Sequence, residues 1–322
     1  MCRRAHLEDF FVTLRLTMVR KIVSMKEAIS RFVQDGDSIA MGTALEAAIP
    51  FAAGHEIIRQ GKKDLTLIGP ISDMLFDQLI GSGCVKGAVV AWMGNVIMGV
   101  GYNIRRAVES GIPRKIEVAD YTNFTISLGL QAGALGIPFI PTKSLLGTDL
   151  MEGKHPFKEM SCPFTGERLA LVPALRPDVT IVQAQRADEE GNSHFWGGSG
   201  VTKEAALAAR KVIVIVEEIV DKRVIRRDPN RTLIPGFLVH AVVPEPWGAL
   251  PSPIQGYYNR DHEDYITYHH QSKEREGYLK WLEAWVLGVE DRKEYVKRLG
   301  KKRTDSLRVK RHRKSLAVEY GY

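Results

Sequence analysis

Cysteine is scarce in this sequence, and long apolar runs are missing. Its 322 residues include three cysteines, Cys2, Cys84 and Cys162. They lie far apart and form no C-x-x-C pair, which excludes a disulfide scaffold and the common zinc and thiol-redox motifs. No stretch approaches about 18 consecutive apolar residues, so the sequence predicts no membrane-spanning helix. Charged residues interrupt the apolar run of residues 1–17, which argues against a secretory signal. We therefore expect a cytoplasmic protein.

Several catalytic signatures are also missing. The sequence has no G-x-S-x-G elbow, no G-x-x-x-x-G-K-[ST] loop and no H-E-x-x-H motif. The segment Gly99–Ile104 lacks the third glycine of a dinucleotide-binding loop. These absences argue against serine-hydrolase, P-loop and zinc-protease chemistry. We expect no metal cofactor.

The net charge of +7 is concentrated near the C-terminus. The segment KKRTDSLRVKRHRK, residues 301–314, holds eight Lys or Arg residues and one Asp. A folded nucleic-acid-binding domain usually carries its charge on one face, so this pattern favours a solvated basic tail over residues 301–322. Contact of the tail with RNA, an anionic membrane or an acidic partner is the alternative. We expect an N-terminal extension over residues 1–17 and one α/β domain over residues 18–300.

Apolar runs that suit strands alternate with segments of helical periodicity. Short runs rich in β-branched residues predict strands, and apolar residues three and four apart predict helices. Ser24 followed by Glu27 predicts the N-terminus of the first helix. Predicted strands cover residues 38–43, 64–69, 86–95, 137–144, 178–188, 211–220 and 238–246, and predicted helices cover 25–33, 49–60, 72–83, 123–136, 202–210, 273–288 and 291–300. This alternation predicts an α/β fold with an open, mostly parallel sheet covered by helices.

The predicted strands end in turns of small, amide-bearing or hydroxyl-bearing residues. Ligands of open parallel sheets bind at the carboxyl ends of the strands. Glycine lets backbone N–H groups approach a ligand closely, which suits binding of an acyl group and stabilisation of an oxyanion. The turns are Gly42-Thr43, Gly69-Pro70-Ile71-Ser72, Gly94-Asn95, Gln185-Arg186 and Trp196-Gly197-Gly198. The alternative is that these turns only end strands.

Two groups of titratable residues need separate interpretation. His262, His269 and His270 lie in the stretch YYNRDHEDYITYHH. A metal site is one reading, but adjacent histidines do not easily face one ion, so an exposed polar loop is favoured. Glu217 and Glu218 end the most apolar predicted strand, where one of them can act as a general acid or base. A cap or an ion pair is the favoured reading, and its candidate partners are Arg223, Arg226 and Arg227.

The segment DGDSIAMGTALEAAIP, residues 35–50, is similar to the signature of the family I coenzyme A transferases. That signature reads D-G, two residues, three apolar residues, G-G-F, three residues, G, one residue, P. Asp35, Gly36, Gly42 and Pro50 match it. From about residue 18 to 300, the chain resembles the A subunits of glutaconate-type coenzyme A (CoA) transferases. The segments that carry this resemblance are HEIIRQGKKDLTLIG, LIGSGCVKG, LGIPFIPTKSLLGTDL, RPDVTIVQAQRADEEGNSHFWGG and EEIVDKRVIRRDPNRTLIPGFLVHAVV.

The resemblance implies the open α/β fold of the CoA-transferase superfamily and a partner subunit. In such enzymes A and B subunits combine, often as a heterotetramer, and the nucleophilic glutamate lies on the B subunit in a short S-E-N-G-like or E-x-G motif. This chain has no S-E-N-G sequence. The implied reaction moves CoA from an acyl-CoA thioester to a carboxylic acid through a glutamyl-CoA thioester. The A subunit would then supply small turns and N–H donors that hold the acyl group, and it would be active only with the B subunit.

Candidate residues for binding the acyl group and CoA follow from the aligned positions. Gly42 and Thr43 stand in the signature loop, and residues 69–72 stand in the turn that faces the acyl site in relatives. The full set is Gly42, Thr43, Gly69, Pro70, Ile71, Ser72, Asn95, Asn123 and Gln185. Each of them can instead be an ordinary turn residue.

The chain departs from the family pattern within the signature loop. Thr43 and Ala44 replace the second Gly and the Phe, and Ala48 replaces the later Gly. Glutaconate-type A subunits carry a basic pair before the proline, where this chain has residues 46–49 as Glu-Ala-Ala-Ile. A dicarboxylate would lose a charge partner, so glutaconate is disfavoured as the substrate. Glu46 is the one carboxylate here and a minor candidate for the nucleophile.

Two other functions remain open. A related branch of A/B pairs hydrolyses the ring of a steroid-derived CoA thioester, and its relatives place a glutamate where this chain has Asn123. An amide cannot act as a base, so transfer ranks above hydrolysis. The other alternative is a non-catalytic subunit that binds acyl-CoA.

Overall fold

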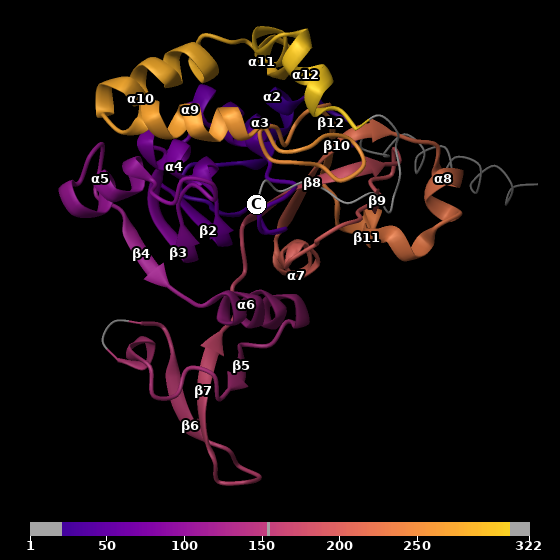
Figure 1. The fold of residues 1–322 in the computed structure, drawn as a ribbon. Helices are drawn as coiled ribbons and strands as arrows, with labels where there is room; N and C mark the ends of the chain where they lie inside the picture. Colours follow the sequence, from indigo (N-terminus) through magenta and orange to yellow (C-terminus); the bar gives the residue numbers. More distant parts are fainter. Residues whose placement is uncertain (1–20, 153–154, 310–322) are drawn as a thin grey trace, which may run out of the picture.

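The computed structural model describes residues 21–152 and 155–309 (Figure 1). The α-helices are α2 (Met25–Phe32), α3 (Phe51–Arg59), α4 (Met74–Gly81), α5 (Tyr102–Ser110), α6 (Asn123–Leu135), α7 (Thr202–Ala208), α8 (Lys222–Arg226), α9 (His262–Ser272), α10 (Arg275–Leu282), α11 (Arg292–Leu299) and α12 (Lys301–Leu307). The strands are β1 (Ser38–Ala40), β2 (Leu65–Ser72), β3 (Val85–Met93), β4 (Glu117–Asp120), β5 (Phe139–Thr142), β6 (Lys158–Ser161), β7 (Arg168–Pro173), β8 (Val179–Ala187), β9 (Ser193–His194), β10 (Lys211–Ile219), β11 (Thr232–Ile234) and β12 (Ala241–Pro244). The predicted extension over residues 1–17 and residues 310–322 of the predicted tail lie outside the described residues.

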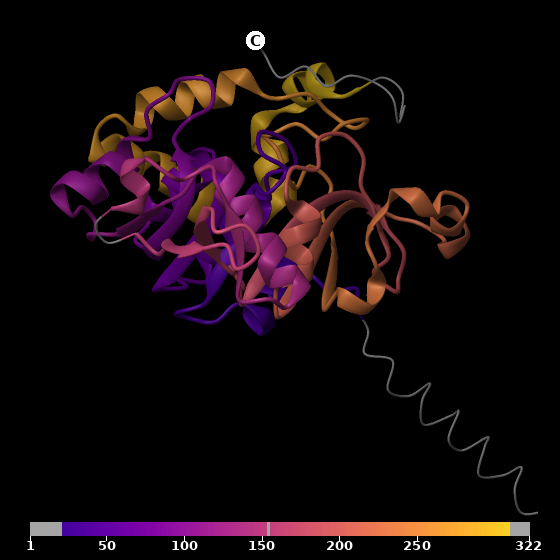
Figure 2. The same ribbon diagram turned by 90° about the horizontal axis from the view of Figure 1, so that it is seen from below.

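The main sheet is parallel along its central strands, as predicted. β1 pairs with β2 on one side and β8 on the other, and the order β4-β3-β2-β1-β8-β10-β12 is parallel throughout. The short strands β9 and β11 are antiparallel additions beside the end of β8. In both views, α5 and α8 lie at opposite ends of this sheet (Figures 1 and 2).

The interior strands are apolar because helices cover both faces of the sheet. In β10 the run Val212–Val216 is completely buried, as expected of a strand covered on two sides. One buried cluster joins the sheet to α3, α4 and α10, and another joins it to α6 and α7. Ser24 caps α2 by accepting the Glu27 N–H at 3.2 Å, which confirms the predicted helix start.

A small antiparallel sheet, ordered β5-β7-β6, projects from the main body beyond α6 (Figure 1). The strand predicted over residues 137–144 is present as β5, but it pairs with β7 in this second sheet and not with the expected single main sheet. β5 and β6 are four residues long, and such short strands give little periodicity to detect.

The C-terminal helices pack back onto the sheet. The stretch read as an exposed polar loop forms α9 instead, with Tyr265 and Tyr268 buried, so that expectation is wrong. The first part of the predicted tail forms α12, in which Thr304 is buried and Arg303 lies 2.8 Å from Asp261. The domain boundary after Gly300 stays a prediction. Within the described residues, no helix is long and apolar enough to cross a membrane.

Candidate active site

The main sheet has a topological switch point between β1 and β8. From β1 the chain moves outward through β2 and β3 to β4, and from β8 it moves outward on the other side through β10 to β12. In open parallel sheets, ligands bind outside the carboxyl ends of the strands at such a point. The carboxyl edge beside β1 and β8 is therefore the candidate active site.

Strand β1 ends before its neighbours do. Ala40 pairs with Ile68 of β2 and with Thr180 of β8. β2 continues to Ser72 and β8 continues to Ala187. The loop that follows β1 therefore begins between two strands that run past it.

Three residues of this loop have a left-handed backbone. Gly42 and Leu45 have φ of +67°, and Ala48 has φ of +53°. Glycine adopts this conformation freely, whereas it costs another residue about 1 kcal/mol. Ala48 stands where the family signature has its later glycine, and this chain holds an alanine there in a left-handed conformation, with strain. A Cβ at Gly42 would lie 4.0 Å from the Ile71 carbonyl oxygen, which makes the two predicted segments neighbours.

Buried polar contacts hold the loop. The Thr43 hydroxyl lies 3.0 Å from that of Thr202, and the Thr43 carbonyl accepts the Val201 N–H at 2.9 Å. The buried guanidinium of Arg260 donates to the Glu46 backbone oxygen at 3.0 Å and to its carboxylate at 3.2 Å. Glu46, the minor candidate for the nucleophile, is therefore ion-paired with a buried arginine.

Residues 69–72 are the last part of β2, and the turn predicted for them is wrong. The ladder with β3 reaches Ser72, which pairs with Met93. A proline fits here because β1 has already ended opposite Ile68, so the missing N–H of Pro70 leaves no gap in a ladder on that side. The segment still lies at the carboxyl end of its strand.

The three predicted amide residues differ in their surroundings. Asn95 is buried: its Oδ1 accepts two backbone N–H groups of its own loop at 3.0 Å, and its Nδ2 donates to the Tyr265 carbonyl at 3.0 Å. Gln185 is also buried and bonds both backbone groups of Trp196, donating at 2.8 Å and accepting at 3.3 Å. Asn123 is exposed at the first position of α6. The two buried amides therefore shape the site from within the fold.

Most of the predicted residues share one edge of the sheet. The carboxyl ends of β1, β2 and β3 carry Gly42, Thr43, Gly69, Pro70, Ile71, Ser72 and Asn95. Gln185 lies on β8, across the switch point, and Asn123 lies on α6. Contact of these residues with a substrate stays a prediction.

Sequence analysis missed the contacts made by the stretch from Tyr257 to Tyr268. Five of its side chains donate to carboxylates far away in the sequence. The pairs are Tyr257 with Glu218 (2.7 Å), Tyr258 with Glu217 (2.7 Å), Arg260 with Glu46 (3.2 Å), Tyr265 with Asp73, and Tyr268 with Asp77 (2.6 Å). The three-residue spacing of Tyr265 and Tyr268 was the available signal for a buried helical face.

The histidines of this stretch do not converge. His262 begins α9, whereas His269 and His270 lie near its other end. At 1.5 Å per residue, these positions are about 10 Å apart along the helix axis. Among the described residues, no group of three His, Cys, Asp or Glu side chains could hold a metal ion.

Glu217 is buried, and desolvation raises its pKa to about 7. Its carboxylate accepts the Trp247 N–H at 2.7 Å and the Tyr258 hydroxyl at 2.7 Å. Glu218 accepts the Tyr257 hydroxyl at 2.7 Å. The favoured readings, a cap of the next segment or an ion pair with Arg223, Arg226 or Arg227, are both wrong. Asp221 caps α8, and tyrosines take the place of the arginines.

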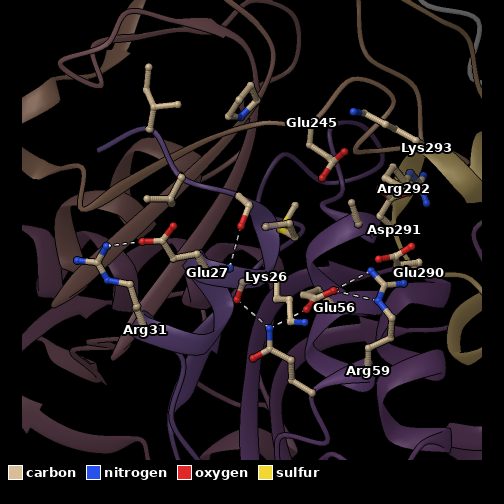
Figure 3. A pocket seen from close by; sticks show the side chains of 17 residues that line it. Lys26, Glu27, Arg31, Glu56, Arg59, Glu245, Glu290, Asp291, Arg292 and Lys293 are labelled. Atoms are coloured by element: carbon tan, nitrogen blue, oxygen red, sulfur yellow. Dashed lines mark hydrogen bonds and ion pairs between the residues drawn. The ribbon is translucent and has the colours of Figure 1, made fainter. Parts of the chain in front are cut away.

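A pocket of about 1030 Å³ lies elsewhere, between α2, α3, the end of β12 and residues 290–293 (Figure 3). Charged side chains pair along its walls, Arg31 with Glu27 at 2.9 Å and Arg59 with Glu56 at 2.9 Å. It flanks the edge strand β12, two strands away from β8. Because it is not at the switch point, we do not place the acyl site there.

Comparison with known proteins decides the family. Residues 22–245 match the model of the coenzyme A transferase family. The chain belongs to this family. It is 41% identical to the A subunit of the 3-oxoadipate CoA-transferase of Pseudomonas knackmussii, over 85% of this chain and 96% of that relative.

A second relative and two crystal structures extend the comparison. The A subunit of the glutaconate CoA-transferase of Acidaminococcus fermentans is 36% identical over 90% of this chain and 95% of its own length. The crystal structure of that transferase matches with a TM-score of 0.84, over 90% of this chain and 96% of the other. The crystal structure of a variant of the decarboxylase AibA/AibB matches with a TM-score of 0.70 at 30% identity, over 82% of this chain and 99% of that one. The expected family and fold are confirmed.

Proposed function

We propose that this chain is the A subunit of a heteromeric CoA-transferase that moves CoA between an acyl-CoA thioester and a carboxylic acid. The observation that carries the proposal is the 41% identity to the A subunit of a CoA-transferase over 96% of that relative. The switch-point loop supports it, because the signature residues lie where an open parallel sheet binds ligands. The names of the relatives, which are themselves A subunits, support a companion B subunit.

The proposed reaction needs one carboxylate nucleophile. A glutamate of the companion attacks the thioester carbonyl, and CoA leaves as a thiolate while an acyl-glutamyl anhydride forms. The thiolate then attacks the glutamyl carbonyl and releases the first acid as a carboxylate. The glutamyl-CoA thioester passes CoA to the second acid by the reverse of these steps. CoA acts as a substrate throughout, and no metal is needed.

The acids on this chain's site edge support a nucleophile from outside. Glu46 is paired with the buried Arg260. Asp73 and Glu217 are almost completely buried and accept hydrogen bonds from tyrosines. A carboxylate held in this way is poorly placed to attack a thioester. This chain would instead position the acyl group against the loop of residues 42–48.

The identity of the acid is proposed from the loop charge. The loop lacks the basic pair of glutaconate-type enzymes, so a second carboxylate on the substrate would find no partner there. This favours an acid without a second charge in that position. The name of the 41% identical relative points to 3-oxoadipate, a dicarboxylic acid, so a substrate panel must include both kinds.

Ring-opening hydrolysis ranks below transfer. The family resemblance implies a glutamate in the hydrolase branch where this chain has Asn123, and an amide cannot accept a proton from water. A non-catalytic acyl-CoA-binding subunit is the other alternative. Copurification with a glutamate-bearing companion and turnover of CoA esters would separate a transferase from a binder.

The test is reconstitution with a B-type subunit, to be sought in the adjacent coding sequence. We expect the purified pair to exchange CoA among acetoacetate, 3-oxoadipate, glutaconate and their CoA donors, and the isolated chain to be inactive. Transfer by the isolated chain would contradict the proposal. Hydrolysis or decarboxylation by the pair without transfer to any acid would replace it with another reaction.

A further inference from the structure

Four donors from one short stretch reach the carboxyl ends of several strands. We call them the strand-end clamp. They are Tyr257, Tyr258, Arg260 and Tyr265, and their acceptors are Glu218 and Glu217 of β10, Glu46 after β1 and Asp73 after β2. None of these pairs is local, because the partners lie 39 to 214 residues apart in sequence. The clamp therefore joins loops that the sheet alone leaves independent.

The loop after β1 is held by Arg260. Its side chain is completely buried, whereas that of Glu46 is 27% exposed. The guanidinium bonds both the carboxylate and the backbone oxygen of Glu46. It thus fixes the main chain between Leu45 and Ala48, the two left-handed residues of the loop other than Gly42. A buried charge-assisted bond of this kind is worth more than a neutral one.

The ends of β2 and β3 are held by Tyr265. Its hydroxyl donates to Asp73, which caps α4 and also accepts the Val96 N–H at 3.3 Å. Its backbone carbonyl accepts from Asn95 at 3.0 Å. One residue of α9 therefore fixes the turns after two neighbouring strands. The Arg260 guanidinium also lies over the ring of Tyr265, 5.5 Å from its centroid, so the two clamp residues are in contact.

We propose that Arg260 and Tyr265 are positioning residues, which set the relative geometry of the loops after β1, β2 and β3 for the transfer reaction. The proposal rests on the proposed function and adds the residues that align its site. Transfer needs the acyl group held within about 0.5 Å of its productive position relative to the attacking oxygen. Loops that follow separate strands keep such fixed relative positions only if rigid side-chain contacts connect them.

Helix α9 offers a matched control. Tyr268 is also buried and donates to a buried aspartate of α4, but that aspartate, Asp77, lies one turn into the helix, away from the strand ends. Each aspartate has two further donors, Met74 and Val96 for Asp73 and Asn103 and Ile104 for Asp77. Tyr265→Phe and Tyr268→Phe therefore each remove one tyrosine–aspartate bond, at different places, and Tyr268→Phe also removes the bond that Asn103 donates at 3.2 Å.

The first test compares the two variants in the A/B complex. We expect Tyr265→Phe to lower kcat about tenfold with KM changed less than about threefold, because geometry in the transition state is lost. Tyr268→Phe should leave kcat within about twofold of the wild type. Its thermal midpoint should fall about as far as that of Tyr265→Phe. Equal kcat for the two variants would overturn the proposal.

The second test needs no activity. Hydrogen exchange of the full chain is compared for Arg260→Lys and Arg106→Lys, where Arg106 bonds the carbonyls of Ser272 and Lys273 at the far end of α9. We expect amides of residues 42–48 to exchange about tenfold faster in Arg260→Lys alone. Unchanged exchange there would overturn the clamp. Absence of CoA transfer in the wild-type complex would refute the proposed function instead. The exchange result would still show whether Arg260 holds the loop of residues 42–48.

Discussion

The carboxyl edge at the switch point and the pocket beside β12 use their charges differently. In the pocket, the pairs Arg31–Glu27 and Arg59–Glu56 are three or four residues apart on single helices. At the carboxyl edge, Arg260 reaches Glu46 across 214 positions. Pairs within a helix stabilise that helix locally, whereas long-range pairs fix segments relative to one another. The pair at the carboxyl edge thus fixes loops from separate strands, whereas the pairs in the pocket stabilise single helices.

The largest effect on activity should come from a substitution that displaces the loop after β1. A Cβ at Gly200 would overlap the Thr43 carbonyl, and Gly200 has φ of +50°. We expect Gly200→Ala to lower kcat/KM by about tenfold or more and stability by about 2 kcal/mol.

Gly61→Ala is the matched control for Gly200→Ala. Gly61 has φ of +61° with nothing within 4 Å of a Cβ, so its strain should cost about 1 kcal/mol without changing activity. Steady-state kinetics of the A/B complex and urea denaturation measure both variants. Equal activity loss in both would show that the Thr43 contact does not matter.

The next effect is a pH dependence from Glu217. Burial raises its pKa from 4.5 to about 7, so the folded state binds more protons than the unfolded state between these values. Stability contributed by this group therefore falls as pH rises from about 4.5 to 7, by at most about 1.4 kcal/mol per pH unit. Glu217→Gln should remove that decline.

Urea denaturation between pH 5 and 8 checks the Glu217 prediction. Glu218→Gln, a change at the partly exposed neighbouring acid, serves as the control and should follow the wild-type slope. If the free energy of unfolding of Glu217→Gln changed with pH in the same way as that of the wild type, Glu217 would not be the source of the decline.

A smaller effect should follow from relieving strain at Ala48. Its φ of +53° is unfavourable for alanine, so Ala48→Gly should raise stability by about 1 kcal/mol, partly offset by the entropy of glycine in the unfolded chain. Thermal unfolding measures this gain. A loss of stability would mean that the methyl group packs well enough to outweigh the strain.

The smallest effect on stability and activity is expected from a substitution in the pocket beside β12. Glu27→Gln removes the exposed pair with Arg31 on α2, so stability should fall by about 1 kcal/mol or less. Activity of the A/B complex should stay within about twofold, because the pocket is away from the switch point. A kcat loss like that of Tyr265→Phe would move the site toward the pocket.

The parallel core could be predicted because its signal is local. Apolar runs such as Val212–Val216 show burial on both faces within a few residues. The small sheet was missed because β6 carries Lys158 and Glu159 and is four residues long. The clamp was missed for a different reason: nothing near Arg260 in the sequence indicates that its partner is Glu46. Tertiary pairs of this kind are set by the fold.

The central claim is that this chain forms one wall of a shared site while its companion supplies the attacking carboxylate. Incubating the A/B complex with an acyl-CoA, trapping the covalent CoA thioester and mapping it by mass spectrometry of peptides tests this directly. The account predicts the adduct on a glutamate of the companion. An adduct on Glu46, or on any other carboxylate of this chain, would contradict it.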